Sequence, residues 1–497
     1  MQRKRKKNSE MIIDCPRIAF SALRGNSGKT FMTTGVTAYL RKEGKAISPF
    51  KKGPDYIDAA WLGLAAGRLC YNLDAFMMKK DDLFLSFLTH TSQADGALLE
   101  GNRGLFDGMD REGSYSTAEL AKMLKIPVIL IVDCTMATRT VAAMVLGCQN
   151  FDLTVPIKGV ILNRIRGGRH ESIVRAAVEE YCGVPVLGTV PNIKGRIFPE
   201  RHMGLIPPQE HPGASKSIDE AAGMAERFLD MQGIWKVACG ASPLCIPGFD
   251  EDTTRGGLFS KPYRKPRIGV VRDSAFWFYY PDNLEALEKL GAEMVDCNAL
   301  AQQKLPEVDA LYIGGGFPET HAEALACNIG FRRSLLDAVE IGLPVYAECG
   351  GLMYLGEKLV IEGRTFPMAG VFPFTFALQQ RPKAHGYTIL EADQPNPYFK
   401  VGETIHGHEF HYSRILDWEE KKISLALKMR RGYGLDGRRD GLCYKRVMAT
   451  YSHLHVLGTK GWARSFFDQA VSYSREADIN KEDLSFYGRR LPAALNF

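Results

Sequence analysis

The chain has 497 residues, of which 45% are hydrophobic and 24% charged, a composition typical of a folded globular protein that excludes a disordered or low-complexity chain. Its net charge is +6, and the stretch "RKRKK" at residues 3–7 supplies five of the positive charges, so the remainder is close to neutral. We interpret this basic start as a solvated arm and predict no nucleic-acid partner.

Eleven cysteines are scattered along the chain without a C-x-x-C pair, which argues against a disulfide framework and against a zinc site. The apolar run "MIIDCPRIAF" at 11–20 is interrupted by Asp14, Pro16 and Arg17. It is too short and too charged for a signal sequence or a membrane span. We therefore expect a cytoplasmic protein with reduced thiols and no membrane partner.

The first strand expected in chain order, "RIAFSAL" at 17–23, leads into a glycine-rich bend and a helix. The bend allows positive φ, so backbone N–H groups can converge on a phosphate at the positive end of the helix. The lysine would then reach the β- and γ-phosphates, and the threonine hydroxyl would bind Mg²⁺. An ordinary strand-to-helix turn stays open, because Leu23 stands where the full phosphate-binding pattern has glycine. The loop predicted to bind the nucleotide consists of Gly25, Asn26, Ser27, Gly28, Lys29 and Thr30.

Short β-branched runs then alternate with amphipathic stretches, as in "VILIVDC" at 128–134 and "IKGVILNRI" at 157–165. This alternation predicts βαβ units and a mostly parallel sheet, hence an α/β protein. A stretch rich in Pro, Gly and Ser reads as a linker, and a second α/β series begins at "RIGVV". The boundaries we predict are 16–235 for the first domain, 236–266 for the linker, 267–475 for the second domain, and 1–15 and 476–497 for peripheral tails.

The second series contains "VYAECGGLMYL" at 345–355, a strand that enters Cys349, two glycines and a helix. A nucleophile on such a sharp turn needs small neighbours, and the helix N-terminus behind it favours the thiolate. The backbone N–H groups of Gly350 and of Gly315, in "GGGFPE" at 314–319, would form an oxyanion hole. A late strand, "MATYSHLHV", ends at His453, which we predict to be the base. A buried structural cysteine is the alternative.

These blocks resemble those of a class I, triad-type glutamine amidotransferase domain. The first half resembles a dethiobiotin-synthetase-like P-loop domain, through "PFKKGPDYIDAAW" at 49–61, "YNLDAFM" at 71–77, "LEGNRGLFDGMD" at 99–110 and "GVILNRI" at 159–165. The order of the blocks is that of the cobyrinate a,c-diamide synthase family. The resemblance covers roughly residues 16–465 and implies a P-loop domain followed by a flavodoxin-like amidotransferase domain.

The resemblance implies amidation of the a and c acetate carboxylates of a tetrapyrrole polycarboxylate in cobalamin biosynthesis, with ATP, Mg²⁺ and L-glutamine. ATP would activate each carboxylate as an acyl phosphate, which ammonia then attacks. In the first half it implies that Asp55 and Glu100 join Thr30 as metal ligands. Asp58 and Asp107 would orient the substrate carboxylate or its acyl phosphate, Tyr56 and Ile57 would face the macrocycle, and Asn163 would read adenine.

In the second half the resemblance implies that Cys349 attacks the glutamine amide while His453 moves the proton. The sequence departs from the usual His-x-Glu of amidotransferases, because Leu454 and His455 follow His453. This implies a dyad or a substitute group that orients the histidine. "GHEFHYS" at 407–413 is expected to be a loop of the glutamine pocket rather than a metal cluster.

Several alternatives stay open from the sequence. Hydrogenobyrinate and nickel-sirohydrochlorin resemble cobyrinate in shape and peripheral acids, so either could be the substrate of the same diamidation. A nucleotide switch of the partitioning-ATPase type shares a basic residue at the position of Arg24, but it lacks the half that carries Cys349 and His453. A homodimer is the assembly we consider.

Overall fold

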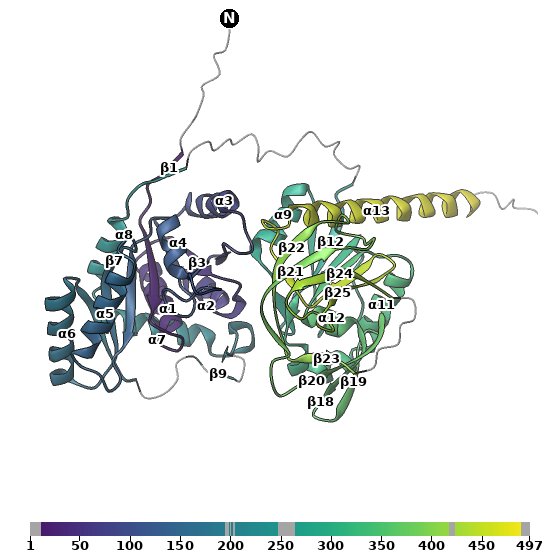
Figure 1. Cartoon of the computed structure of the whole chain (residues 1–497). Coiled ribbons are helices and arrows are strands. Elements are labelled where there is room, and N and C mark those ends of the chain that lie inside the picture. The colour runs from purple at the N-terminus through teal and green to yellow at the C-terminus, as the bar shows by residue number, and fades with distance from the viewer. Residues whose placement is uncertain are drawn as a thin grey trace, which may run out of the picture. The chain divides into compact units, whose positions relative to one another are not determined.

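The computed structural model describes residues 11–193, 198, 200–201, 204–246, 264–416 and 423–488. The chain divides into two compact units, residues 1–258 and 259–497, and each is described by itself (Figure 1). Both units combine helices with sheets that contain parallel strands, which confirms the α/β class. Within these described ranges, no helix is long and apolar enough to cross a membrane.

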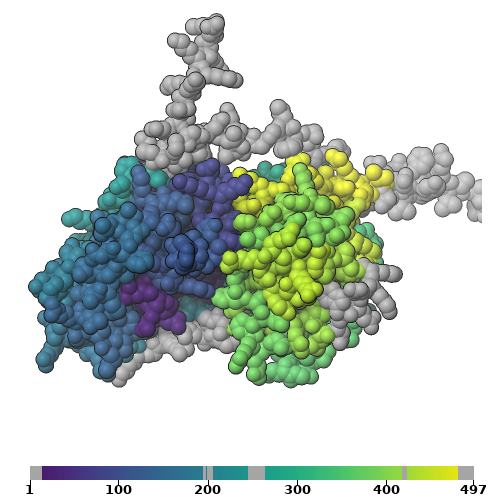
Figure 2. Space-filling view, in the orientation of Figure 1, coloured from purple at the N-terminus to yellow at the C-terminus, as the bar shows by residue number. Residues whose placement is uncertain are grey.

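The first unit is built on a seven-stranded sheet in which every neighbouring pair of strands is parallel. Parallel sheets are covered on both faces, so their strands are nearly continuous apolar runs, and "VILIVD" is buried along almost its whole length. In Figure 2 the purple residues, which come early in the described part of the chain, form a small patch on the visible face of this unit. The strand order is β4 (Tyr71–Leu73), β3 (Ile47–Lys52), β5 (Gly96–Glu100), β2 (Arg17–Ala22), β6 (Val128–Asp133), β7 (Ile157–Ile165) and β8 (Val186–Pro191).

Helices join these strands, and the first helix packs against the second and the seventh. Their apolar sides meet the sheet in a cluster that includes Ile18, Met32, Val36, Leu98 and Ile129. The helices are α1 (Lys29–Lys42), α2 (Tyr56–Ala66), α3 (Lys80–Thr91), α4 (Thr117–Met123), α5 (Thr140–Phe151), α6 (Gly168–Cys182), α7 (Ala214–Phe228) and α8 (Met231–Cys239), with a short β9–β10 pair (Glu200–Arg201 and Gly204–Leu205) and η1 (Pro208–Glu210) before α7.

Strand order fixes where the polar residues of this unit meet. β2 lies in the centre, between β5 and β6, and all three strands run in the same direction. Their carboxyl ends therefore share one edge of the sheet, which is where open α/β sheets bind ligands. The glycine-rich loop follows β2 at this edge, and Glu100 is the last residue of β5.

The structure differs from the expected linker and tails in three places. Helix α8 (Met231–Cys239) extends into the expected linker. Strand β11 (Leu244–Ile246), also in the expected linker, pairs antiparallel with β1 (Met11–Ile13), which lies in the expected N-terminal tail. Two short apolar segments, "MII" and "LCI", supply this pairing. In the expected C-terminal tail, helix α13 (Lys460–Gly488) extends past residue 476, because no proline or glycine interrupts it after Gly461 until Gly488. The rest of the expected linker, 247–263, lies outside the described residues.

The second unit contains a ten-stranded sheet of mixed direction. The order is β14 (Glu293–Cys297), β12 (Arg267–Val271), β15 (Ala310–Ile313), β17 (Val345–Glu348), β26 (Val447–Thr450), β25 (Arg439–Tyr444), β24 (Ser424–Arg431), β21 (Ala384–Ala392), β22 (Thr404–His411) and β27 (His453–Leu454). Five neighbouring strands, from β14 to β26 in the order across the sheet, are parallel, and the strands beyond β26 pair antiparallel. An antiparallel extension is thus added to the predicted parallel sheet.

Smaller elements complete this unit. A four-stranded sheet gathers at the end of the unit away from α13 (Figure 1). It consists of β19 (Arg364–Pro367), β18 (Gly356–Ile361), β20 (Phe372–Leu378) and β23 (Ser413–Ile415); the other elements are the pair β13 (Phe276–Phe278) and β16 (Gly315–Gly316), η3 (Pro318–His321), and helices α9 (Pro281–Leu290), α10 (Ala322–Cys327), α11 (Ile329–Glu340) and α12 (Gly350–Leu355).

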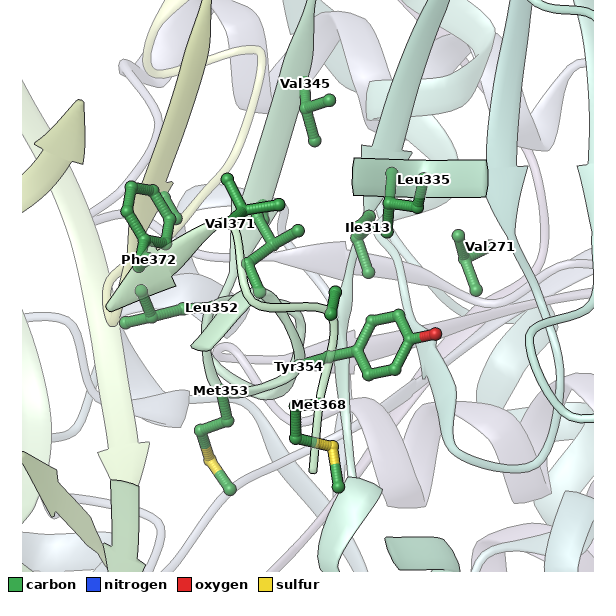
Figure 3. Packing of buried hydrophobic residues seen from close by; sticks show 14 of the residues in the cluster. Val271, Ile313, Leu335, Val345, Leu352, Met353, Tyr354, Met368, Val371 and Phe372 are labelled. Atoms are coloured by element: carbon green, nitrogen blue, oxygen red, sulfur yellow. The ribbon is translucent and has the colours of Figure 1, made fainter. Parts of the chain in front are cut away.

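An apolar cluster supports the turn that carries Cys349 (Figure 3). Ile313 and Val345 come from neighbouring parallel strands, and Leu352 comes from the helix that follows the cysteine. Each of these three side chains is fully buried, and burial of such a side chain stabilises the fold by about 1.5–3 kcal/mol. The turn that carries Cys349 is therefore packed against the hydrophobic core of the second unit.

Candidate functional site

The glycine-rich loop connects β2 to α1, and within it Gly28 and Asn26, but not Gly25, have positive φ. Gly28 has a φ of 90° and Asn26 a φ of 57°. The amide of Asn163, near the end of β7, donates a hydrogen bond of 2.9 Å to the Ser27 carbonyl oxygen. A Cβ atom on Gly28 would lie 2.6 Å from this amide, so only glycine fits here.

Lys29 begins helix α1 directly after this loop. Its ammonium group donates hydrogen bonds to the carbonyl oxygens of Arg24, at 3.3 Å, and Arg103, at 2.8 Å. The side chain is mostly buried, and burial lowers its pKa. These contacts hold the cation at the mouth of the loop, where it can meet a phosphate group.

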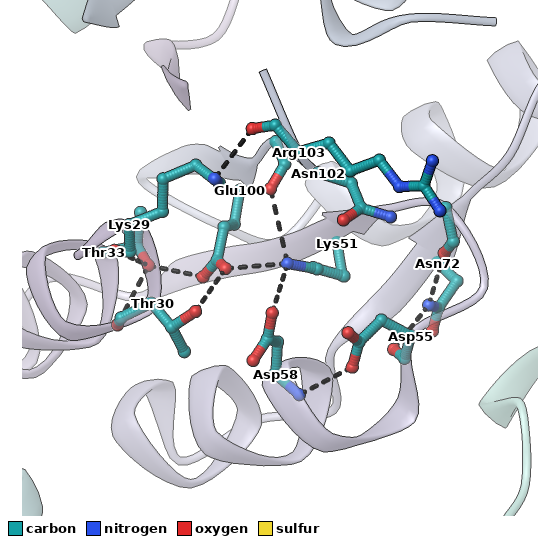
Figure 4. A network of polar contacts seen from close by, with 12 residues as sticks. Lys29, Thr30, Thr33, Lys51, Asp55, Asp58, Asn72, Glu100, Asn102 and Arg103 are labelled. Carbon is teal, nitrogen blue, oxygen red and sulfur yellow. Dashed lines mark hydrogen bonds and ion pairs between the residues drawn. The ribbon is translucent and has the colours of Figure 1, made fainter. Parts of the chain in front are cut away.

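Beside the loop lies a network of buried charges around Lys51 (Figure 4). The Lys51 ammonium lies 2.6 Å from a carboxylate oxygen of Asp58 and 2.7 Å from one of Glu100. Strand register explains the second contact, because Lys51 on β3 pairs with Glu100 on β5. The hydroxyl groups of Thr30 and Thr33 on α1 also donate hydrogen bonds to Glu100.

Asp55 completes the arrangement from the start of α2. It caps that helix by accepting a hydrogen bond of 2.9 Å from the Asp58 backbone N–H. Burial and the nearby Asp58 carboxylate raise the pKa of Asp55 to about 7. Burial also acts to raise the pKa of Asp58, but the charge and hydrogen bond of Lys51, together with the hydrogen bonds with Glu100 and Thr30, outweigh it and lower this pKa. Burial also raises the pKa of Glu100.

Three other residues predicted for the site of this half are Asp107, Tyr56 and Ile57. Asp107 accepts a hydrogen bond from the backbone N–H of Gly104 in its own loop and lines a hollow of about 910 Å³ in this unit. Tyr56 is buried, and Ile57 packs partly against the cluster around Trp61. The macrocycle contacts expected of Tyr56 and Ile57 therefore stay predictions.

Cys349 lies on a strained turn in the second unit. It stands between β17 and α12 with a φ of 47° and a ψ of −98°, which is uncommon for a residue with a side chain. Its neighbours must be small, because a Cβ atom on Gly351 would lie 2.5 Å from the Ile313 carbonyl oxygen. Burial raises the pKa of the Cys349 thiol, so the free thiol form is favoured until a base accepts its proton.

Gly315 and Gly350, the expected oxyanion-hole residues, lie close to the two reacting groups. A Cβ atom on Gly315 would lie 2.5 Å from the Cε1 atom of His453, and one on Gly350 would lie 3.0 Å from the Gly316 nitrogen. The glycine-rich segment at 314–316 thus passes close to His453 and to the turn that follows Cys349. Which backbone N–H groups receive the oxyanion stays a prediction.

His453 is contacted by groups from two neighbouring elements, β17 and β22. Its Nδ1 atom lies 3.3 Å from a carboxylate oxygen of Glu348 on β17. The ring of His408, on β22, stacks on it with centroids 4.9 Å apart. Gly407 on β22 makes this approach feasible, because a Cβ atom there would lie 2.4 Å from the His453 carbonyl oxygen.

The segment "GHEFHYS" was expected to be a loop, and that expectation was wrong. Its first five residues lie in strand β22, which pairs with β21 and β27. The strand is buried along most of its length, and even the charged Glu409 within it is buried. Glu409 accepts hydrogen bonds from the backbone N–H groups of Tyr433 and Gly434. In the part of the chain that the structure describes, no group of three His, Cys, Asp or Glu residues could hold a metal ion.

Comparison with known proteins gives the same division of the chain. Residues 18–205 match the family model of the CobQ/CobB/MinD/ParA nucleotide binding domain, and residues 267–461 match that of the CobB/CobQ-like glutamine amidotransferase domain. A protein of Magnetococcus marinus called cobyrinate a,c-diamide synthase is 43% identical over 451 residues, which cover 90% of this chain and 96% of that protein. This chain belongs to the cobyrinate a,c-diamide synthase family.

Two further members of the cobyrinate a,c-diamide synthase family match over similar lengths. The protein of Archaeoglobus fulgidus is 41% identical over 460 residues, 92% of this chain and 98% of its own length. The protein of Methanosarcina acetivorans is 37% identical over 482 residues, 92% of this chain and 96% of its own length. The amidotransferase half and these full-length matches exclude the nucleotide-switch alternative for this family member.

The sequence analysis did not identify two charged residues that lie at the two candidate sites, Lys51 at the nucleotide site and Glu348 at the amidotransferase site. Lys51 lies within the quoted block "PFKKGPDYIDAAW", and two buried carboxylates contact it, but a lysine pair on a strand carries no signal of its own. Glu348 precedes the nucleophile in "AECGG" and stands 105 positions before the histidine that it contacts. The first contact follows from the pairing of β3 with β5, and the second from the pairing of β17 with β26, which ends three residues before His453.

Proposed function

We propose that the chain catalyses ATP- and glutamine-dependent amidation of the a and c acetate carboxylates of cobyrinate, in cobalamin biosynthesis. The observation that carries this proposal is the presence of a nucleotide-binding half and a glutamine amidotransferase half in one chain, along nearly the full length of relatives called cobyrinate a,c-diamide synthase. A carboxylate is a poor electrophile, so it must be activated before ammonia can attack it. The first half would bind the ATP that activates it, and the second half would release the ammonia from glutamine.

In the first half, the γ-phosphoryl group of ATP passes to the substrate carboxylate and gives an acyl phosphate. Such a transfer depends on positioning and charge neutralisation rather than on a protein nucleophile. Lys29, held between two carbonyl oxygens, neutralises phosphate charge, and the N–H groups from Gly25 to Gly28 surround the phosphate chain. Asp58 and Asp107 orient the carboxylate before transfer and the acyl phosphate after it.

The residues of this half also fit a magnesium ion. Thr30, Asp55 and Glu100 offer the oxygen atoms that Mg²⁺ prefers, and the Thr30 hydroxyl is already 2.9 Å from Glu100. When bound, Mg²⁺ would neutralise charge on the phosphate oxygens. Asn163 contacts the backbone of the phosphate-binding loop and would read the adenine of the bound ATP.

In the second half, the Cys349 sulfur attacks the side-chain amide of L-glutamine, and a thioester forms as the C–N bond breaks. His453 accepts the thiol proton and delivers it to the departing nitrogen, which leaves as ammonia. Water then hydrolyses the thioester to glutamate and restores the thiol. The backbone N–H groups of Gly315 and Gly350 would stabilise the oxyanion in both steps.

The proposed magnesium site leads to a prediction about pH. Asp55 can bind the metal only when it is ionised, and a pKa of about 7 means that its ionised fraction rises from about one tenth at pH 6 to about nine tenths at pH 8. The Mg²⁺ concentration that half-saturates ADP release should therefore fall up to about tenfold over this range. Titrations of ADP release with Mg²⁺ at pH 6, 7 and 8 measure this change.

The matched variants are Asp55→Asn and Asp152→Asn. The first should weaken Mg²⁺ binding and remove its dependence on pH. Asp152 lies outside the cluster with a pKa of about 2, so its replacement should leave both properties unchanged. An identical Mg²⁺ requirement at the three pH values in the unmodified protein would contradict the assignment of Asp55.

The substrate is tested by ADP release from the purified protein with MgATP and glutamine, with cobyrinate, hydrogenobyrinate or nickel-sirohydrochlorin added in turn. Conversion of a carboxylate to an amide makes the product lighter by about one mass unit, so mass spectrometry counts the amidations. We expect two amidations of cobyrinate. Two amidations of one of the other macrocycles alone would transfer the proposal to that substrate, and no release of ADP with any of them would contradict it.

Two further properties belong to this proposal. The reaction uses ATP and a free thiol, which favours action in the cytoplasm, and the cysteines whose side chains the structure describes are all free. A homodimer stays a prediction, which sedimentation of the purified protein would test.

A further inference from the structure

The amidotransferase half lacks a carboxylate two residues after His453, yet the structure provides one from another direction. Glu348 is the last residue of β17 and directly precedes the nucleophile. Its Oε2 atom lies 3.3 Å from the His453 Nδ1 atom, and both side chains are at most 3% exposed. We propose that Glu348 is the positioning residue that orients the His453 ring for glutamine hydrolysis, in place of the missing carboxylate.

The contacts of Glu348 hold its carboxylate in one orientation. Oε1 accepts a hydrogen bond of 3.3 Å from the backbone N–H of Leu454, and Oε2 accepts one of 3.2 Å from the Tyr312 hydroxyl. Asn283 extends the network, since it donates to the Leu454 carbonyl oxygen and accepts from the Val456 N–H at 2.7 Å. The segment that follows the base, Leu454 to Val456, is thus held in place beside the carboxylate.

This geometry indicates which ring nitrogen of His453 carries the proton and which is free to accept one. A carboxylate accepts hydrogen bonds, so Nδ1 carries the proton that faces Glu348, and Nε2 is left with a lone pair. Nε2 is therefore the atom that accepts the thiol proton of Cys349 and later releases it to the leaving nitrogen. The Glu348 charge also stabilises the imidazolium that forms between these two transfers, without itself being protonated.

A second buried pair in the same unit provides a matched control. The His455 Nε2 atom lies 3.3 Å from a carboxylate oxygen of Asp282, and both side chains are also almost fully buried. The two carboxylates thus resemble each other in burial and in their distance to an imidazole. Only Glu348 contacts the histidine that we assign as the base, so only its replacement should slow the chemical step.

The test compares Glu348→Gln, Glu348→Asp and Asp282→Asn in glutamine hydrolysis and in synthesis from ammonium salts. Glu348→Gln should lower kcat for hydrolysis by about 100-fold or more, with KM changed by less than about threefold. Glu348→Asp should recover part of kcat. All three variants should retain synthesis from ammonium salts, and Asp282→Asn should also retain hydrolysis.

Nitrogen NMR of histidine-labelled protein supplies a readout that packing alone would not change. The unmodified protein should show His453 protonated at Nδ1, and Glu348→Gln should show a mixture of the two neutral forms. If Glu348→Gln does not fold, Tyr312→Phe replaces it, because it removes one donor to the same carboxylate and should lower kcat severalfold.

Two results would overturn the assignment: a kcat within threefold of normal in Glu348→Gln, or an equal fall in Asp282→Asn. The inference rests on the proposed hydrolysis of glutamine by Cys349. Glutamine hydrolysis that persists in Cys349→Ala would instead refute that underlying step, so the two failures can be told apart.

Discussion

Lys29→Ala is expected to abolish amidation whether glutamine or an ammonium salt supplies the nitrogen. The Lys29 ammonium is the cation placed at the mouth of the phosphate-binding loop, and carbonyl oxygens of Arg24 and Arg103 hold it there. Groups that neutralise charge during phosphoryl transfer contribute about 10³-fold or more to the rate. ADP release and amide formation, measured with both nitrogen sources, should each fall by at least this factor.

The control for this experiment lies on the same helix. Lys42 ends α1 and is largely exposed, where it forms an ion pair with Asp219, so Lys42→Ala should leave the rate within about twofold. Glutamine hydrolysis at Cys349 should survive in Lys29→Ala, because the second half carries its own chemistry. Normal amidation in Lys29→Ala would refute the assignment of the phosphate-binding loop.

Cys349→Ala should have the opposite pattern, with loss of glutamine-dependent synthesis and retention of synthesis from ammonium salts. Alanine cannot form the thioester, so glutamine hydrolysis should fall below about one thousandth of its normal rate. The synthetase half needs only ammonia and should run at its usual rate when ammonium is supplied. Amide formation with each nitrogen source, measured side by side, separates these two effects.

Another buried cysteine in the same unit serves as the control. Cys443 is buried on β25, and burial raises its pKa to about 12, so it is a structural thiol. Cys443→Ala should retain synthesis from glutamine, although its stability should fall, because a buried side chain is truncated. Loss of ammonium-dependent synthesis in Cys349→Ala would refute the separation of the two chemistries.

The sequence by itself determined the local features of both halves. The alternation of apolar runs with amphipathic stretches predicted two α/β domains, since this pattern depends only on residues close together in the chain. The glycines before Lys29 and after Cys349 predicted the two strand-to-helix turns for the same reason. The expected loop at 407–413 was wrong, because it was carried over from a family motif, whereas the pairing of β22 with β21 and β27 makes the segment a strand.

Only the tertiary structure decided which charged groups meet. Lys51 contacts Glu100 because β3 and β5 are neighbours in register, although 49 positions separate them along the chain. Glu348 reaches His453 across 105 positions, because the ends of β17 and β26 lie side by side. The physical reason is that local spacing fixes the direction of a side chain on its own element, whereas the order and register of the strands fix its neighbours.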